Sequence, residues 1–342
     1  MPVDFYGQPP ADAMPPQMAL LAAFCHARGH GFRIEDEFSK ALARVERGGR
    51  SFLAGAHLVP FYPLNPAHLA AIARDKAHTA DILARGGLGV PRGQAFFVDR
   101  RTRYLRPAGR EIADALAYAR RERFPLFVKP NSGSQGALAE TVHDEAELLD
   151  QLLAIRERDH MALVQEVIDE PEYRVFVVGG AVAFTYRRSP PALVGNGRES
   201  VRGLLARHND ATAERVESRV AADSPYLRRA LARAGWTLDT VPEPGIRLRL
   251  SQRSNLAGGG ALADYSEAPP PALSQWVARL LGLMPLAVCG IDLFAPDGLD
   301  RPDRFRVIEV NSNPSLLGLL ASGREAACFA ILDRVCALYF GD

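Results

Sequence analysis

The amino-acid sequence predicts a mixed α/β fold in which short buried strands alternate with helices. Three observations predict it. Segments such as 126–129, 162–167 and 289–294 are short and apolar, which is typical of buried strands. Longer segments between them have apolar residues at helical spacing, and 25 prolines and 29 glycines divide the chain into these pieces. A chain of 342 residues is long enough for two or three subdomains around shared cores.

The first third of the chain is expected to begin with a small α/β unit. After a proline-rich tail, the expected elements are a helix (18–28), two strands (41–45 and 51–59), a helix (74–83), a strand (94–98) and a helix (110–121). Gly29 and Gly31 end the first helix, and Gly48-Gly49 forms the turn between the two strands. The prolines at positions 60, 63 and 66 then interrupt the chain, because proline breaks regular hydrogen bonding.

The middle of the chain is expected to be built around a loop of small residues, Asn131-Ser-Gly-Ser-Gln-Gly136. The expected elements are a strand on each side of the loop (126–129 and 137–142), a helix (144–157), a strand (162–167) and two more strands (173–178 and 181–187). The acidic first turn of the helix suits the positive end of its dipole. Gly179-Gly180 suits a hairpin turn between the last two strands.

The last part of the chain is expected to end in a strand pair and a helix. The expected elements are two helices (201–209 and 226–234), a strand (245–250), a helix (273–281), two strands (289–294 and 305–311) and a final helix (323–339). Three prolines precede the helix at 273, where a helix tolerates proline in its first turn. A polar turn separates the last two strands, which indicates an adjacent antiparallel pair.

The composition excludes several classes of protein. Formal net charge is +1, so no global basic field would attract nucleic acid or an anionic membrane. The arginine-rich segment 198–233 is balanced by acidic residues and has no aromatic stripe for stacking on bases. No apolar run approaches the roughly 20 residues of a membrane span, and the polar start of the chain predicts no secretory signal. Four cysteines without a CxxC pair predict free thiols in the cytoplasm.

Three oxygen-bearing side chains near the end of the chain suggest a metal site. Glu309 and Asn311 are two residues apart on one expected strand, so they share a face, and Asp292 can oppose them from the neighbouring strand. Carboxylate and amide oxygens together with substrate phosphates are what Mg²⁺ prefers. The flanking residues are apolar, and a buried strand should not carry unpartnered carboxylates. The alternative is that these residues lie on the solvated face of a hairpin.

A second group of residues suggests phosphate binding. Lys129 ends an expected strand, and the small residues that follow would let backbone N–H groups close over phosphate oxygens. The spacing is not that of a Walker loop. The alternative is a flexible surface hairpin with a solvated lysine.

Three further segments carry polar residues with weaker signals. Gln165-Glu166 ends an apolar strand and could hold a purine edge, and Arg187-Arg188 could clamp phosphate or carboxylate. Gly258-Gly-Gly260, preceded by Arg253 and Asn255, would allow close approach of the backbone to a ligand. The alternatives are a solvent-facing acid, a solvated strand end and a floppy loop.

In chain order, these pieces resemble the ATP-grasp superfamily. The resemblance rests on Asp75-Lys76, Phe127-Val-Lys-Pro130, Gln165-Glu166, Arg253-Ser-Asn-Leu-Ala-Gly-Gly-Gly260, Gly290-Ile-Asp292 and Glu309-Val-Asn311, and it covers roughly residues 70 to 320. The likeness is greatest to the ATP-grasp domain of cyanophycin synthetase. Glutathione synthetase-like and ribosomal-protein glutamate ligases are broader relatives.

The resemblance implies a fold and a division into domains. The implied ATP-grasp fold has two α+β subdomains that grip ATP, preceded by a small α/β N-terminal domain. The implied boundaries are 1–73, 74–168 and 169–342, and the last contains the metal site and a helical insertion near 198–240.

The resemblance also implies roles for individual residues. The implied nucleotide-binding residues are Lys76 and Lys129 for the phosphates, Ser132, Gly133, Ser134 and Gly136 in the mobile loop, Gln165, Glu166, Val167 and Ile168 for adenine, and Glu172 near the ribose. The implied metal ligands are Asp292, Glu309 and Asn311. The residues implied to stabilise phosphate or the reaction intermediates are Arg174, Arg188, Arg253 and Asn255.

The function implied is ATP-dependent amide-bond formation between a carboxylate and an amine through an acyl-phosphate. The implied cofactors are ATP and Mg²⁺, with Mn²⁺ as an alternative, and the implied substrates are amino acids or peptides. A chain of this length leaves no room for the second ligating domain of cyanophycin synthetase, which favours a freestanding single-step ligase. The family often forms dimers or tetramers, so the resemblance also implies a homodimer or a homotetramer. The alternatives are a phosphotransferase or carboxylase on the same nucleotide site and a catalytically silent scaffold module.

Overall fold

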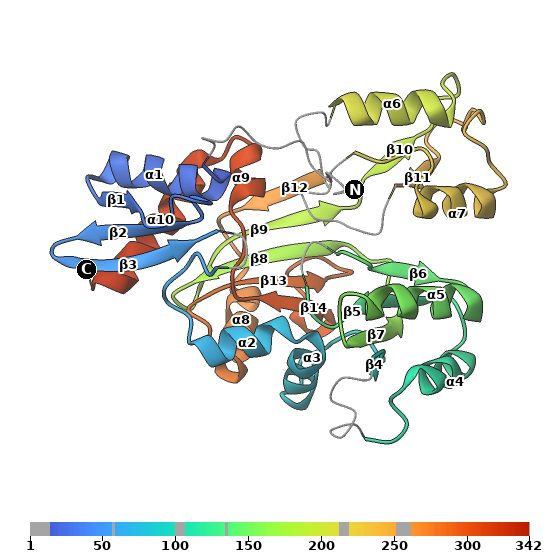
Figure 1. Cartoon of the computed structure of the whole chain (residues 1–342), viewed down its shortest axis with the longest axis horizontal. Coiled ribbons are helices and arrows are strands. Elements are labelled where there is room, and N and C mark those ends of the chain that lie inside the picture. The colour runs from blue at the N-terminus through green and yellow to red at the C-terminus, as the bar shows by residue number, and fades with distance from the viewer. Residues whose placement is uncertain are drawn as a thin grey trace.

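The structure of the protein is a computed structural model that describes residues 14–56, 59–99, 107–133, 136–211, 219–250 and 261–341. It has the mixed α/β fold that the sequence predicts. Figure 1 shows a central sheet with smaller sheets and helices placed around it.

The central sheet has five strands, and every pairing in it is antiparallel. The strand order is β12 (Ala261–Ser266), β9 (Ala181–Ser189), β8 (Glu172–Val178), β13 (Val288–Phe294) and β14 (Arg306–Asn311). The predicted hairpin at Gly179-Gly180 and the predicted pairing of the last two strands are both confirmed. This sheet carries six of the predicted polar site residues, namely Glu172, Arg174, Arg188, Asp292, Glu309 and Asn311.

The two faces of the central sheet are used differently. Val175 and Val177 point to one face, into a core with α8 (Pro271–Leu283), α2 (Ala67–Arg74) and α3 (Lys76–Arg85). Phe176 and Val178 point to the other face, under α10 (Glu325–Phe340) and α9 (Leu317–Ala321). Because strand side chains alternate, Arg174 lies on this second face, beyond the end of that core. One face is therefore apolar at one end and carries charged groups at the other.

A four-stranded antiparallel sheet forms a separate layered unit. Its order is β4 (Gly93–Phe97), β7 (Met161–Glu166), β5 (Leu126–Pro130) and β6 (Glu140–Val142). The helices α4 (Ile112–Glu122) and α5 (Glu145–Arg156) cover one face and share its core. Asp144 caps α5 through the backbone N–H of Glu147, as the acidic start of the predicted helix suggests.

The two remaining sheets are small. The first contains β1 (Gly31–Ile34), β2 (Leu42–Arg47) and β3 (Arg50–Gly55), and with α1 (Pro16–Arg28) it shares a core with α10 from the other end of the chain. The second pairs β10 (Ala192–Val194) with β11 (Arg247–Arg249) and packs on α6 (Val201–Ala211) and α7 (Pro225–Ala234). Figure 1 shows this α6–α7 unit above the four-stranded sheet.

The predicted helix over 74–83 is wrong at its start. Two helices meet there, α2 (Ala67–Arg74) and α3 (Lys76–Arg85), with Asp75 in an extended conformation between them. The Asp75 side chain accepts a hydrogen bond from the backbone N–H of His78 and so caps α3. As a result, Lys76 is the first residue of α3.

Several short elements were not predicted, namely α2, α9, β1, β10, β12 and the 3₁₀ turn η3 (Pro302–Arg304). Most of them have six residues or fewer, which leaves too little periodicity to detect. The strand predicted over 51–59 ends at Gly55, and the strand predicted over 137–142 begins only at Glu140. The division at residues 73 and 168 stays a prediction.

Candidate active site

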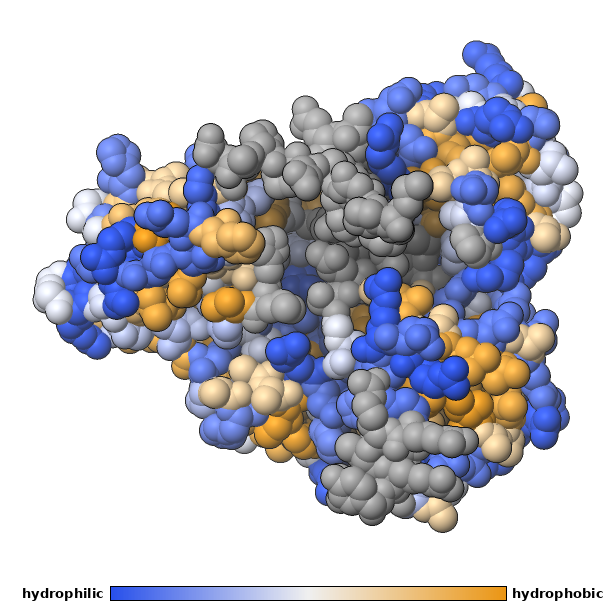
Figure 2. Space-filling view, viewed as in Figure 1, coloured by the Kyte–Doolittle hydropathy of each residue, from blue (hydrophilic) through white to orange (hydrophobic). Residues whose placement is uncertain are grey.

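A cleft of about 1550 Å³ lies between the four-stranded sheet, the central sheet and the α6–α7 unit. In Figure 2 the surface is hollowed between these parts of the molecule. Every predicted site residue that the structure describes lines this cleft: Lys76, Lys129, Ser132, Gly133, Gly136, Gln165, Glu166, Val167, Ile168, Glu172, Arg174, Arg188, Asp292, Glu309 and Asn311. Ser134, Arg253 and Asn255 lie outside the described residues.

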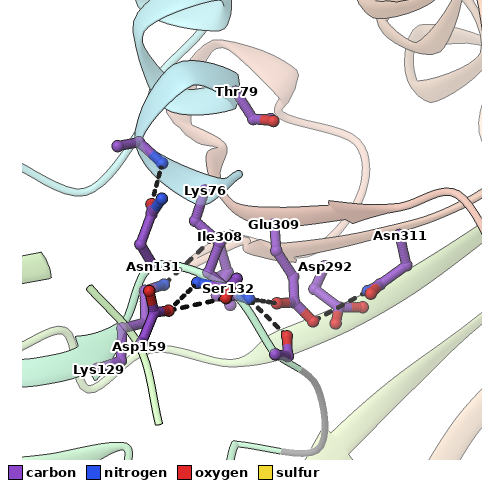
Figure 3. Close-up of polar contacts among 12 residues, drawn as sticks. Lys76, Thr79, Lys129, Asn131, Ser132, Asp159, Asp292, Ile308, Glu309 and Asn311 are labelled. Atoms are coloured by element: carbon purple, nitrogen blue, oxygen red, sulfur yellow. Dashed lines mark hydrogen bonds and ion pairs between the residues drawn. The ribbon is translucent and has the colours of Figure 1, made fainter. Parts of the chain in front are cut away.

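The floor of the cleft is the charged end of the central sheet. Asp292 pairs with Glu309 on β14 in the ladder and with Arg174 on β8. Asn311 lies two residues after Glu309, and its Nδ2 donates a hydrogen bond of 2.9 Å to Glu309 Oε1. The predicted convergence of these three oxygen-bearing side chains is therefore present in the geometry, as Figure 3 shows.

Asp292 is held by two arginines. Its side chain is only 2% exposed, Arg174 forms a two-pronged ion pair with its two oxygens, and Arg188 pairs with Oδ2. Burial raises the pKa of Asp292 above the ordinary range, and the two guanidinium groups act against that rise. The two arginines thus offset the desolvation of the carboxylate.

Arg188 brings a second carboxylate into the same cluster. Its guanidinium also donates to Glu172, so Arg188 bridges the acid predicted near the ribose and the acid predicted to bind metal. The Nε atom of Arg188 is buried and has no hydrogen-bond partner within the described part of the chain. A buried donor without a partner is energetically unfavourable. This N–H group therefore marks a position from which Arg188 would donate a hydrogen bond to a ligand oxygen.

Two lysines approach the acidic cluster from the opposite side. Lys76 Nζ lies 2.8 Å from the carbonyl oxygen of Gly133 and 3.4 Å from Glu309 Oε2 (Figure 3). Lys129 is 6% exposed, and its Nζ lies 3.4 Å from the carbonyl oxygen of Ile308. The ammonium groups of Lys76 and Lys129 thus both lie near the Glu309 end of the acidic cluster.

These charges shift one another's ionisation. Burial lowers the pKa of Lys129 to about 8, although Glu309 acts in the other direction. Burial acts to raise the pKa of Glu309, but Lys76, the Asn311 amide and Lys129 outweigh it and hold the pKa at about 2. Glu309 is therefore an anion at any physiological pH, whereas Lys129 titrates just above neutrality.

The loop that follows Lys129 is anchored by a residue that the sequence did not reveal. Asp159 Oδ2 accepts hydrogen bonds from the backbone N–H of Ser132 at 2.6 Å and from its hydroxyl at 2.8 Å. Asp159 is 5% exposed and lies just before β7, far from Ser132 in the sequence. Nothing in the local pattern signals this contact, because it depends on how β5 pairs with β7.

The end of β7 and the two residues after it form the far end of the cleft. Gln165 is buried, and Val167 and Ile168 also line the wall. The Glu166 carboxylate accepts a hydrogen bond of 2.9 Å from the backbone N–H of Arg92. Glu166 therefore already helps to join β7 to the segment before β4, in addition to its place in the cleft.

Other parts of the cleft wall were not anticipated. Tyr226, Ala230 and Arg233 of α7 and Leu317 and Leu320 of α9 all line it. Two ion pairs, Arg229–Glu140 and Arg233–Glu147, join α7 to β6 and α5 of the four-stranded sheet. The α6–α7 unit therefore closes one side of the cleft.

The donor set fits a hard cation only with help from a ligand. Within the ranges described above, no group of three or more His, Cys, Asp and Glu side chains forms a metal site. The candidate set has two carboxylates, from Asp292 and Glu309, and one amide, from Asn311. Mg²⁺ commonly takes a few protein oxygens and completes its coordination with phosphate oxygens and water, so this set suits a metal that arrives with a nucleotide. Across the same described residues, no helix is long and apolar enough to cross a membrane.

The chain is similar in sequence to two kinds of curated protein. It is 28% identical over 266 residues to the glutathione biosynthesis bifunctional protein GshAB of Mannheimia succiniciproducens, which covers 72% of this chain and 32% of that protein. It is 28% identical over 254 residues to the cyanophycin synthetase of a Nostoc species, covering 71% and 26%. The chain thus spans about a third or less of the length of these relatives. No protein-family model matches the chain.

The fold has a counterpart among solved structures. The bifunctional glutathione synthetase from Pasteurella multocida superimposes with a TM-score of 0.53 at 22% sequence identity. The match covers 90% of this chain and 41% of that one.

Proposed function

We propose that the chain is an ATP-dependent carboxylate–amine ligase of the ATP-grasp superfamily, which its similarity to the GshAB and cyanophycin synthetase proteins supports. The observation that carries the proposal is the meeting of two lysines, two arginines and the Asp292–Glu309–Asn311 cluster in one cleft. Such a distribution of charge suits a triphosphate, its metal and a carboxylate at the same time.

The nucleotide would lie along the cleft. Its adenine would rest against the segment from Gln165 to Ile168, where two polar residues are followed by two apolar ones. Its phosphates would reach Lys76 and Lys129 under the loop that begins at Ser132. We propose these roles from position in the cleft and from the chemistry of the side chains.

The metal site would be Asp292, Glu309 and Asn311. A bound Mg²⁺ or Mn²⁺ ion would supply charge neutralisation for the phosphates. Glu309 is ready for this role because its low pKa keeps it ionised. Lys76, which now contacts Glu309, is then free to turn to a phosphate oxygen, because lysine is flexible and its charge is not directional.

The reaction would have two steps. A substrate carboxylate oxygen attacks the γ-phosphorus, the bond to ADP breaks, and an acyl-phosphate forms. The amine nitrogen then attacks the acyl carbon, inorganic phosphate leaves, and the nitrogen loses a proton. Lys129, Arg174 and Arg188 would neutralise the charge that develops on the transferred group, and no protein nucleophile is required.

The acyl-phosphate must be shielded from water. The α6–α7 unit covers one side of the cleft, and the loop at Ser132–Gly133 covers the phosphate end. The substrates that best suit this account are an amino acid or peptide carboxylate and an amine, because arginines surround the floor of the cleft.

The test is phosphate release from Mg-ATP in the presence of pooled amino acids and short peptides, with mass spectrometry of the products. A ligase releases phosphate only when both substrates are present, and its product is lighter by one water than the two together. A product that keeps the phosphate would instead indicate a phosphotransferase, and nucleotide binding with no turnover on any pool would favour a silent module.

A further inference from the structure

One buried amide joins the two segments that carry the lysines. Asn131 is 1% exposed and lies two residues after Lys129. Its backbone carbonyl accepts a hydrogen bond of 3.1 Å from the backbone N–H of Lys76. Its side-chain Oδ1 accepts one of 2.8 Å from the backbone N–H of Ala77 (Figure 3). The first turn of α3 is thus attached to the end of β5 through this one residue.

Two more contacts fix Asn131 itself. Its backbone N–H donates to the carbonyl of Met161 on β7 at 3.0 Å. Its side chain also hydrogen-bonds the Asp75 carboxylate. Burial acts to raise the pKa of Asp75, and the hydrogen bonds from His78 and from Asn131 lower it. Asn131 therefore connects α3, β5 and β7, and it is almost completely buried.

These contacts determine which groups at the start of α3 remain available to bind a ligand. The backbone N–H groups of Ala77 and His78 are both taken, one by Asn131 and one by Asp75. The start of this helix therefore presents the Lys76 side chain, which already reaches Gly133 and Glu309. The positions of both lysine backbones are fixed relative to Asn131 before any nucleotide binds.

We propose that Asn131 is a positioning residue that sets the spacing of Lys76 and Lys129 for the phosphates of ATP. This inference rests on the proposed function. Asn131 acts through the lysines and not by touching the nucleotide, because its side chain is engaged by α3. Losing its side chain leaves Lys129 in place on β5 and keeps the backbone bond to Lys76. It removes the hydrogen bonds to Ala77 and Asp75 that hold the first turn of α3, so the two charges are no longer held at a fixed separation along one phosphate chain.

A purely structural role predicts something different. If Asn131 served only the stability of the fold, its loss would weaken all nucleotide contacts alike. If it sets the lysine spacing, the loss affects ligands with phosphates and spares adenosine, which has no phosphate and reaches only the segment from Gln165 to Ile168 and the neighbourhood of Glu172. The comparison of ATP with adenosine therefore separates the two roles.

The experiment measures dissociation constants of Mg-ATP and adenosine for the wild type, Asn131→Ala and a control, Asn209→Ala. Asn209 also holds two backbone groups, the N–H and carbonyl of Val220, but it lies in the α6–α7 unit away from the lysines. Asn131→Ala is expected to weaken ATP about tenfold, the effect of losing one or two buried hydrogen bonds, and to leave adenosine unchanged. Asn209→Ala should change neither affinity.

A charge-neutral exchange tests the hydrogen bonds directly. Asn131→Asp alone keeps the acceptor for Ala77 but places two carboxylates together, and it should weaken ATP. Adding Asp75→Asn supplies the missing donor, keeps a good helix cap and restores the original charge. The double variant should therefore recover wild-type affinity for ATP. This pair also decides the matter if Asn131→Ala does not fold.

Equal weakening of ATP and adenosine, or an Asn131→Ala variant that binds ATP like the wild type, would overturn the inference. So would a double variant no better than Asn131→Asp. Failure of the wild type to bind Mg-ATP at all would instead overturn the proposed function, and the inference with it.

Discussion

Lys76 Nζ lies 3.4 Å from Glu309 Oε2, so a proposed phosphate ligand and a proposed metal ligand neutralise each other in the absence of a nucleotide. This ion pair closes the cleft floor from the α3 side. Under the proposed function, a Mg-nucleotide would therefore not enter a field of unbalanced charge. Glu309 would help to hold the metal, and Lys76 would turn from Glu309 to a phosphate oxygen.

The first prediction concerns Glu309. Glu309→Ala should abolish turnover with Mg-ATP, because the metal loses a carboxylate ligand. The fold should persist, since Glu309 makes its contacts with side chains at the cleft floor and not in a hydrophobic core. Turnover and the circular dichroism spectrum should be measured together. Full activity of this variant with Mg²⁺ would rule out the metal assignment.

The second prediction follows from the pKa of Lys129. With a pKa of about 8, Lys129 is mostly protonated at pH 7 and mostly neutral at pH 9. Mg-ATP affinity should therefore fall as pH rises through 8, approaching a tenfold loss per unit at higher pH if the charged form is required. Lys129→Ala should bind ATP weakly at every pH, and Lys129→Arg should remove the fall. An identical fall in Lys129→Ala would assign it to another group.

The third prediction concerns the buried charges around Asp292. Asp292→Ala leaves Arg174 and Arg188 without their shared partner in a buried site, where breaking such a pair destabilises by about 3–5 kcal/mol. Urea denaturation should show this loss in the free energy of unfolding. Val194→Ala, at an exposed strand position, is a suitable control and should be close to neutral. A stability equal to that of the wild type would mean that the arginines find other partners.

The fourth prediction concerns the two ion pairs between α7 and the four-stranded sheet. They are partly exposed, so each should add less than about 1 kcal/mol to stability. Their effect on the reaction should be larger, because α7 is a wall of the cleft. Arg233→Glu should increase ATP hydrolysis without ligation, and Glu147→Arg in the same chain should reverse the increase. If the ratio of hydrolysis to ligation does not change, α7 has no part in excluding water.

The sequence predicts the parts of the site that lie on regular strands. Glu309 and Asn311 are two positions apart in an apolar strand and therefore share a face. The polar turn before residue 305 makes this strand a neighbour of the strand at 289–294. These two facts together place Asp292 opposite Glu309, as the structure does. The Gly179-Gly180 turn similarly brings Arg188 and Glu172 into register across β8 and β9.

The sequence does not predict the contacts that depend on packing between elements. The pattern from Arg74 to Leu83 is helical throughout, and the break at Asp75 is visible only once Asn131 is seen beside it. Asp159 is an ordinary acid before a strand until the pairing of β5 with β7 brings Ser132 to it. The place of α7 in the cleft wall has the same origin, because its ion pairs join segments far apart in the chain.

The central claim is that ATP activates a carboxylate as an acyl-phosphate in this cleft. The most direct measurement uses a substrate carboxylate labelled with ¹⁸O and follows the label by mass spectrometry during ligation. The account predicts that one labelled oxygen appears in the inorganic phosphate and none in the nucleotide. Label in AMP, or ligation with unlabelled phosphate, would contradict it.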